Sequence, residues 1–311
     1  MSKRASRRAS TVGALLVAPA LFVGAPATAA PAGSAPSTAA ERPAIQTTTR
    51  TVDVVGSPTG FTAPAARRAG IASFRVSTTD PAGIRLGLFR LKPGVPLGRY
   101  LVHLRTALSG EREEAVAAGR KVVREATLLG GVNALPGQPA TLTQALRPGT
   151  YHLIDYEDID DGGGRPVTVR ALTVTDRIEH DVPDRPDAMI RMVETPSGPR
   201  FQAPRTLRSG ASVLVTNLSN QVDEAIFVPV RPGTTSKDVQ RFFDAIERGE
   251  WPPESPFTGL PQGMPVISPG HAAVIRPGLM PGEYALVTWV TDLGNGAGRA
   301  VQGMHTLVTV V

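Results

Sequence analysis

The sequence predicts an all-β protein made of two tandem Greek-key β-sandwich domains, each with an inserted helix. Two observations lead to this prediction. Short alternating or β-branched segments are separated by Pro-Gly and Gly-rich turns, and several sequence blocks occur twice in the same order. The chain has no cysteine, so no disulfide contributes and apolar cores must stabilise the fold. Aromatic residues make up 5% of the chain, so we expect these cores to rest mainly on Val, Ile, Leu and Ala.

Residues 1–29 have the three regions of a secretory signal peptide. Four basic residues precede an apolar run from Val12 to Ala25, and Ala27-Thr28-Ala29 forms a small-residue cleavage site. The apolar run is shorter than the roughly 20 residues that cross a bilayer, and Pro19 interrupts it. We therefore predict cleavage near Ala29 and a secreted, extracellular chain without a membrane span. An uncleaved membrane anchor is the alternative.

Removal of this signal changes the charge of the protein. The full chain has 33 Lys and Arg against 27 Asp and Glu, and four of the basic residues but none of the acidic ones precede the cleavage site, which leaves +2. The remaining basic residues are scattered, so no nucleic-acid partner is expected. We expect a protein or cell-surface partner instead. The high content of Ala, Arg, Gly and Pro is typical of actinobacterial proteins.

Three blocks of the sequence recur later in the chain, in the same order and at nearly constant spacing. The offsets between the copies are 140, 139 and 133 residues. The blocks are Phe61–Gly70 with Phe201–Gly210, Leu91–Gly94 with Val230–Gly233, and Leu146–Tyr151 with Leu279–Tyr284. Such a series indicates a duplicated domain. We predict a tether over 30–50 that is rich in Ala, Pro, Ser and Thr, a first domain over 51–176, a linker over 177–187 and a second domain over 188–311.

Each predicted domain contains short strands and one interrupting helix. In the second domain, Thr235 or Ser236 caps a helix that ends at Gly249, and its apolar face consists of Val239, Phe242, Phe243 and Ile246. The same positions of the first domain form a smaller face, consisting of Tyr100, His103, Leu104 and Ala107. A second helical stretch, Glu111 to Ala126, follows in the first domain. The second domain has the proline-rich segment 251–257 in its place. The predicted strands are Ile71–Ser77, Leu86–Leu91, Tyr151–Tyr156, Val167–Val174, Ser212–Asn217, Ala225–Val230, Tyr284–Val290 and Thr306–Val311.

The segment Leu279–Thr288, together with Gly303-Met304, resembles the last third of the cupredoxin (blue-copper) fold. A blue-copper site needs two imidazoles and a thiolate, with a weak thioether ligand. The resemblance puts these ligand positions at Asp223, Thr288, Arg299 or Ala300, and Met304. Only the methionine has the required side chain. In the first domain the corresponding positions are Ile84 and Asp155. The resemblance therefore implies a fold that has lost its copper ligands, and we expect no cofactor.

Other catalytic and metal-binding patterns are weak or missing. The histidines are dispersed along the sequence and form no His-x-His pair; they are His103, His152, His180, His271 and His305. No nucleophile elbow, phosphate-binding glycine loop or zinc-protease helix occurs. The acidic stretch Asp155 to Asp161 departs from the EF-hand spacing, so we interpret it as a solvated turn, and calcium binding stays open. We expect that the protein is not an enzyme.

Because these catalytic and metal-binding patterns are weak or missing, we predict a binding function. The end of the second domain where a metal loop would lie gathers residues that are common at interfaces: Trp289, Asp292, Asn295, Arg299, Met304 and His305. We predict that they form a contact surface of an exported, copper-free interaction module. A second, weaker candidate is Trp251. The alternatives are a Trp289 that only covers the core, and a secreted enzyme or a metal carrier that holds calcium or another non-blue metal.

Overall fold

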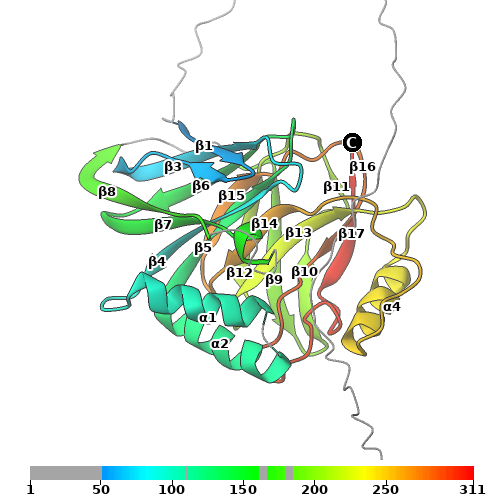
Figure 1. The fold of residues 1–311 in the computed structure, drawn as a ribbon. Helices are drawn as coiled ribbons and strands as arrows, with labels where there is room; N and C mark the ends of the chain where they lie inside the picture. The colour runs from blue at the N-terminus through cyan, green and yellow to red at the C-terminus, as the bar shows by residue number, and fades with distance from the viewer. Residues whose placement is uncertain (1–50, 110, 161–166, 180–184) are drawn as a thin grey trace, which may run out of the picture.

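The computed structural model describes residues 51–109, 111–160, 167–179 and 185–311 (Figure 1). The predicted signal peptide, the tether and part of the predicted linker lie outside these residues. Within them the chain is mostly β-structure, with strands joined in one large sheet. No helix in the described part is both long enough and apolar enough to span a membrane.

In the described part of the first half of the chain, β4 is the central strand. This strand pairs antiparallel with β5 and β7, and β7 pairs antiparallel with β8. On the other side, β3 runs parallel to β1 and β8 and antiparallel to β6. The strands are β1 (Thr51–Ser57), β2 (Gly60–Thr62), β3 (Ala66–Thr78), β4 (Ile84–Leu91), β5 (Ala126–Ala134), β6 (Ala140–Leu146), β7 (Gly149–Asp155) and β8 (Val169–Glu179).

The second half pairs its strands in a matching order. Strand β13 lies between β14 and β16, β16 pairs with β17, and β12 runs parallel to β9 and antiparallel to β15. The strands are β9 (Ala188–Thr195), β10 (Gly198–Gln202), β11 (Thr206–Leu207), β12 (Val213–Leu218), β13 (Asp223–Pro229), β14 (Gln262–Ile267), β15 (Ala272–Arg276), β16 (Gly282–Val287) and β17 (His305–Val310). The division into two Greek-key domains stays a prediction, and β8 continues past Arg177 into the predicted linker.

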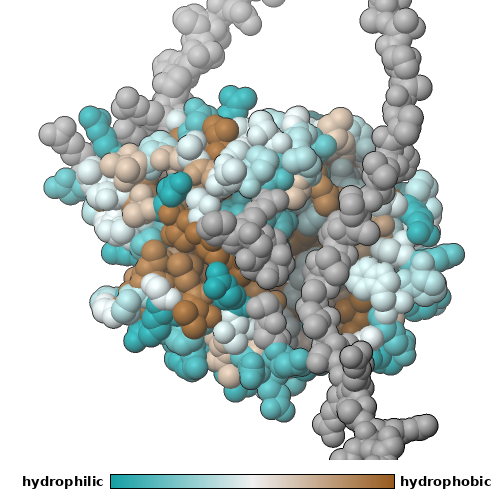
Figure 2. Space-filling view, viewed as in Figure 1, coloured by the Kyte–Doolittle hydropathy of each residue, from teal (hydrophilic) through white to brown (hydrophobic). Residues whose placement is uncertain are grey.

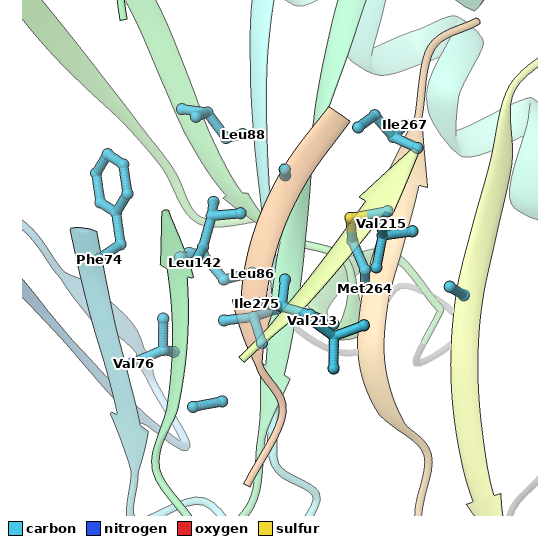
Figure 3. Close-up of a cluster of buried hydrophobic side chains, with 14 of the residues drawn as sticks. Phe74, Val76, Leu86, Leu88, Leu142, Val213, Val215, Met264, Ile267 and Ile275 are labelled. Carbon is cyan, nitrogen blue, oxygen red and sulfur yellow. The ribbon is translucent and has the colours of Figure 1, made fainter. Parts of the chain in front are cut away.

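The two halves are in direct contact. Strand β14 pairs with β5 through Gly263 and Asn133, and β15 pairs with β6 through Ile275 and Leu142. One buried apolar cluster includes residues of both halves. Figure 3 shows part of it, with Phe74 and Leu142 on one side and Val213 and Met264 on the other. Outer strands such as β1 and β6 alternate buried and more exposed residues and contribute one apolar face, whereas β4 and β13 are buried over several consecutive residues, because other elements cover both of their faces.

The helices of the described residues lie outside the strands and are α1 (Leu97–Ser109), α2 (Arg112–Glu125), α3 (Glu157–Asp160) and α4 (Ser236–Glu247). The cap predicted for α4 is confirmed, because Thr235 and Asp238 form a reciprocal capping box. Helix α4 buries Val239, Phe242 and Phe243 against β13 and β16. Helices α1 and α2 lie together below the sheets in Figure 1, and apolar side chains gather around them in Figure 2.

Candidate functional site

A buried ion pair lies where the second half was predicted to present its former metal loop. Arg299 is 1% exposed, and Asp223, the first residue of β13, is fully buried. Nε of Arg299 donates to Oδ1 of Asp223 at 3.0 Å, and Nη2 lies 2.8 Å from Oδ2. The guanidinium therefore holds both oxygens of one carboxylate, which is the strongest geometry available to such a pair.

Two further carboxylates approach the same guanidinium. Nη2 of Arg299 donates to Oε1 of Glu194 in β9 at 2.7 Å. Nη1 lies 3.9 Å from Oδ2 of Asp292 in the loop between β16 and β17. The Glu194 and Asp292 side chains are 34% and 20% exposed. The cluster thus runs from a fully buried carboxylate to two carboxylates that reach the surface.

Hydroxyl groups supply the remaining contacts of Asp223. Ser219 Oγ donates to its Oδ2 at 2.9 Å, and Thr288 Oγ1 donates to its Oδ1 at 3.4 Å. Asn217 Oδ1 lies 2.7 Å from the Ser219 hydroxyl, and Asn217 Nδ2 donates to the main-chain carbonyl of Ile267. A buried carboxylate needs such partners because burial without them is strongly unfavourable.

These surroundings change the protonation of both partners. Burial raises the pKa of Asp223 to about 6, although Arg299 and Ser219 act to lower it. Burial acts to lower the pKa of Arg299, but the carboxylates of Asp223 and Glu194 outweigh it, so this pKa lies above its ordinary value. At neutral pH both groups are charged, and the ion pair is intact.

The structure brings together three of the positions that the resemblance assigned to copper ligands. Thr288 and Arg299 both donate hydrogen bonds to Oδ1 of Asp223. Met304 is fully buried, and its main-chain N–H donates to the carbonyl of Arg299 at 3.0 Å. A guanidinium offers no acceptor to a metal and is itself a cation. These residues therefore do not fit a blue copper ion.

The first half differs at its equivalent positions. Ile84 is buried in the core, and Asp155 Oδ1 accepts the main-chain N–H groups of Arg85 and Glu157 at 3.0 and 3.1 Å. Burial raises the pKa of Asp155 to about 6. Asp158 accepts the main-chain N–H of Thr168, and part of the acidic stretch Asp155 to Asp161 lies outside the described residues. Among the residues that are described, no three His, Cys, Asp or Glu side chains are placed to hold a metal ion.

The predicted contact surface needs correction for two of its members. Arg299 and Met304 are interior residues, because the loop folds inward to place the guanidinium on Asp223. Asn295 is exposed, whereas Asp292 is partly buried and its Oδ1 accepts the main-chain N–H of Gly294 at 2.7 Å. His305 is also partly buried, and its Nε2 forms a hydrogen bond with Gln240 of α4 at 2.8 Å.

Trp289 lies between α4 and the proline-rich segment. Its ring is 4.8 Å from that of Phe243 and 6.0 Å from that of Phe257. Phe242 lies beside Trp289 and Phe257, and all four of these contacts are edge-to-face, the arrangement that aromatic quadrupoles favour. The tryptophan therefore contributes packing to the side of the second half, and it is only partly exposed.

Helix α2 of the first half covers part of this end of the second half. Arg120 Nε donates to the carbonyl of Leu293 at 2.7 Å, and Arg112 Nη1 donates to the carbonyl of Gly296 at 3.2 Å. Arg112 also pairs with Glu247 of α4. The sequence predicted this helix but not which part of the protein it contacts, because these contacts join residues more than 130 positions apart.

A more open surface lies beside α4. Trp251 is 64% exposed, and its ring contacts that of Phe242 at 6.0 Å. Next to it is a groove of about 490 Å³ between the start of α4 and residues 252–256. The groove is lined by Arg231, Pro232, Gly233, Thr234, Asp238, Arg241, Phe242, Pro252, Pro253, Glu254, Ser255 and Pro256. Sequence reasoning ranked Trp251 second, since exposure cannot be inferred from a proline-rich segment alone.

The remaining histidines have separate roles. His103 Nδ1 contacts Glu125 at 2.8 Å, and His152 stacks on Phe89 at 5.1 Å. Burial lowers the pKa of both His152 and His271. His180 lies outside the described residues. The described histidines therefore resemble ordinary packed or paired side chains rather than ligands.

Similarity to known proteins is found among solved structures. No protein-family model and no curated protein matches the sequence. Among solved structures, the chain is similar to auracyanin B, with 17% identity over 42% of this chain and 93% of that one, and a TM-score of 0.24. It is similar to a multicopper oxidase, with 11% identity over 84% and 89% and a TM-score of 0.23. A copper nitrite reductase from Thermus scotoductus SA-01 shows 12% identity over 84% and 61%, with a TM-score of 0.24.

These proteins have the cupredoxin fold, and the chain resembles them in fold alone. The described residues are mostly β-structure joined in one large sheet, so the predicted all-β class is confirmed, whereas the two tandem Greek-key domains stay a prediction. At such low identities and TM-scores, the copper chemistry of these proteins is not carried over to this chain.

Proposed function

We propose that this is an exported, copper-free protein of two tandem Greek-key domains that binds a protein partner at or outside the cell surface. The observation that carries the proposal is the exposed Trp251 beside the groove of about 490 Å³. Tryptophan and arginine dominate the binding energy of many protein interfaces. Trp251 is held in place by Phe242, so little side-chain entropy would be lost when a partner covers it.

The charges of the groove support a polypeptide partner. Arg231 lies 3.7 Å from Glu254, and Arg241 pairs with Asp238, so both signs line the same groove. All of these groups are at the surface, where they can exchange intramolecular partners for those of a second protein. A segment with mixed polar and apolar side chains fits this lining better than a strongly charged polymer.

Binding to intact cells of the producing organism tests this proposal. The labelled mature chain should bind saturably, and Trp251→Ala should weaken binding by at least about tenfold, as expected for the loss of an interface anchor. Val102→Ala is the matched control, because Val102 is 62% exposed on α1, away from the groove. Equal binding by the Trp251→Ala chain would contradict the assignment of this surface.

Two further measurements test the other parts of the proposal. N-terminal sequencing of the secreted protein should give a start near Ala30, and an intact Met1 in a membrane fraction would contradict export. Elemental analysis of the purified chain should find no stoichiometric copper, zinc or calcium. A bound metal would favour a carrier or an enzyme over a metal-free binding protein.

A further inference from the structure

The charge cluster around Arg299 has the organisation of a cation site. Its carboxylates come from three separate elements: Glu194 from β9, Asp223 from β13 and Asp292 from the loop that joins β16 to β17. Three acidic side chains face a single guanidinium. Asp223 is fully buried, so its carboxylate in particular requires a positive charge beside it, because the neighbouring carboxylates would otherwise repel it in a medium of low dielectric constant.

The main chain holds the guanidinium in this position. The N–H of Arg299 donates to the carbonyl of Val290 at 3.0 Å, and its carbonyl accepts the N–H of Met304 at the same distance. Both ends of the loop are thereby fixed around the cation. Gln302 Nε2 also donates to Asp292 at 3.3 Å. The loop is thereby connected to two distant strands through one guanidinium.

We propose that these residues form a cation site that the protein occupies with its own side chain. The cation that fits this site is a planar guanidinium, and Arg299 supplies it and thereby joins the loop to β9 and β13. The bidentate contact with Asp223 explains why the cation is a guanidinium, since its two parallel N–H donors match the two oxygens of one carboxylate. This inference is independent of the partner surface proposed at Trp251.

A cation rescue experiment tests the proposal. Arg299→Ala should lower the Tm and leave a cavity that opens to solvent beside Glu194 and Asp292, which are partly exposed. Guanidinium chloride, added well below denaturing concentration, should raise the Tm of this variant. Sodium chloride at equal ionic strength should not. Ligand that binds only the folded state must stabilise it.

Three variants serve as controls. Arg299→Met fills the space without a charge, so it should lose Tm and not respond to guanidinium. Arg299→Lys keeps a charge but not the planar donor pair, so its Tm should lie between those of the wild type and Arg299→Met. Arg200→Ala removes a nearby arginine that donates to the carbonyls of Pro199 and Gln302, and guanidinium should not rescue it.

The results that would overturn the proposal are equally specific. An Arg299→Met chain as stable as Arg299→Lys would show that packing, rather than charge, is what Arg299 supplies. Equal responses of Arg299→Ala to guanidinium and sodium would show that no guanidinium site exists. If Arg299→Ala does not fold, the ranking of the lysine and methionine variants by Tm still decides between charge and packing.

Discussion

Nε of Arg120 in α2 donates a hydrogen bond to the main-chain carbonyl of Leu293, 2.7 Å away, and thereby joins two segments 173 positions apart. The helix belongs to the first half and the loop to the second. The same loop carries Asp292 and Arg299. Hydrogen bonds from the first half therefore support the loop that contributes to the charge cluster of the second half.

Removal of the hydrogen bonds between α2 and this loop should make the loop more mobile. We expect the Arg112→Ala, Arg120→Ala double variant to lose about 1–2 kcal/mol of unfolding free energy, since its hydrogen bonds are partly exposed. Amide hydrogen exchange should accelerate over residues 292–299 more than in β13. Lys121→Ala, at an exposed position of the same helix, is the control. Unchanged exchange in the loop would show that α2 does not support it.

The ion pair of Arg299 and Asp223 should show strong coupling in a double-mutant cycle. Arg299→Met alone should cost about 3–5 kcal/mol, because it leaves Asp223 buried without its counter-charge. Asp223→Leu combined with Arg299→Met should recover much of this loss, since the buried carboxylate is then gone. Urea unfolding of the single and double variants measures the coupling. Additive losses would argue against a mutually dependent pair.

Asp155 should make the protein less stable as the pH rises. Its folded-state pKa of about 6 lies above the ordinary value of 3.8, so its contribution to stability is full below about pH 4 and is lost as the pH rises through 6. Asp155→Asn removes this titration. At pH 7 the variant should be up to about 3 kcal/mol more stable than the wild type, and the difference should shrink toward pH 4. A pH-independent difference would contradict the shifted pKa.

Tyr151 and Tyr284 should have equivalent stabilising roles. Tyr151 Oη donates to the carbonyl of Arg147 at 3.0 Å, and Tyr284 Oη donates to the carbonyl of Met280 at 2.9 Å, in each case four residues earlier. Each Tyr→Phe change should therefore cost about 0.5–1.5 kcal/mol in thermal or urea unfolding. Tyr156→Phe provides a comparison outside this arrangement. A loss at only one of the two positions would mean that the repeated sequence does not preserve the contact.

Local signals made much of the fold predictable. The capping residues Thr235 and Asp238 lie three positions apart, and the apolar face of α4 repeats with helical spacing, so each could be read without knowledge of the fold. The predicted strand segments correspond to β3, β4, β7, β8, β12, β13, β16 and β17. The other described strands were not predicted, and β8 extends further than expected. The loss of copper ligands was also evident, because residue type alone decides whether sulfur or imidazole is present.

The candidate site was less predictable, and the physical reason is sequence distance. Asp223 and Arg299 were each identified as replaced ligand positions, but no local pattern shows that a charged residue turns inward to meet another 76 positions away. The same limit applies to α2, whose contacts with the loop after Trp289 depend on how the halves meet. The sequence by itself determined the all-β class and showed which of the compared ligand positions lack a copper-binding side chain. Only the tertiary structure decided that Arg299 is buried and paired with Asp223, and that Trp251 is exposed. The reason is that burial and charge pairing depend on which distant segments are brought into contact.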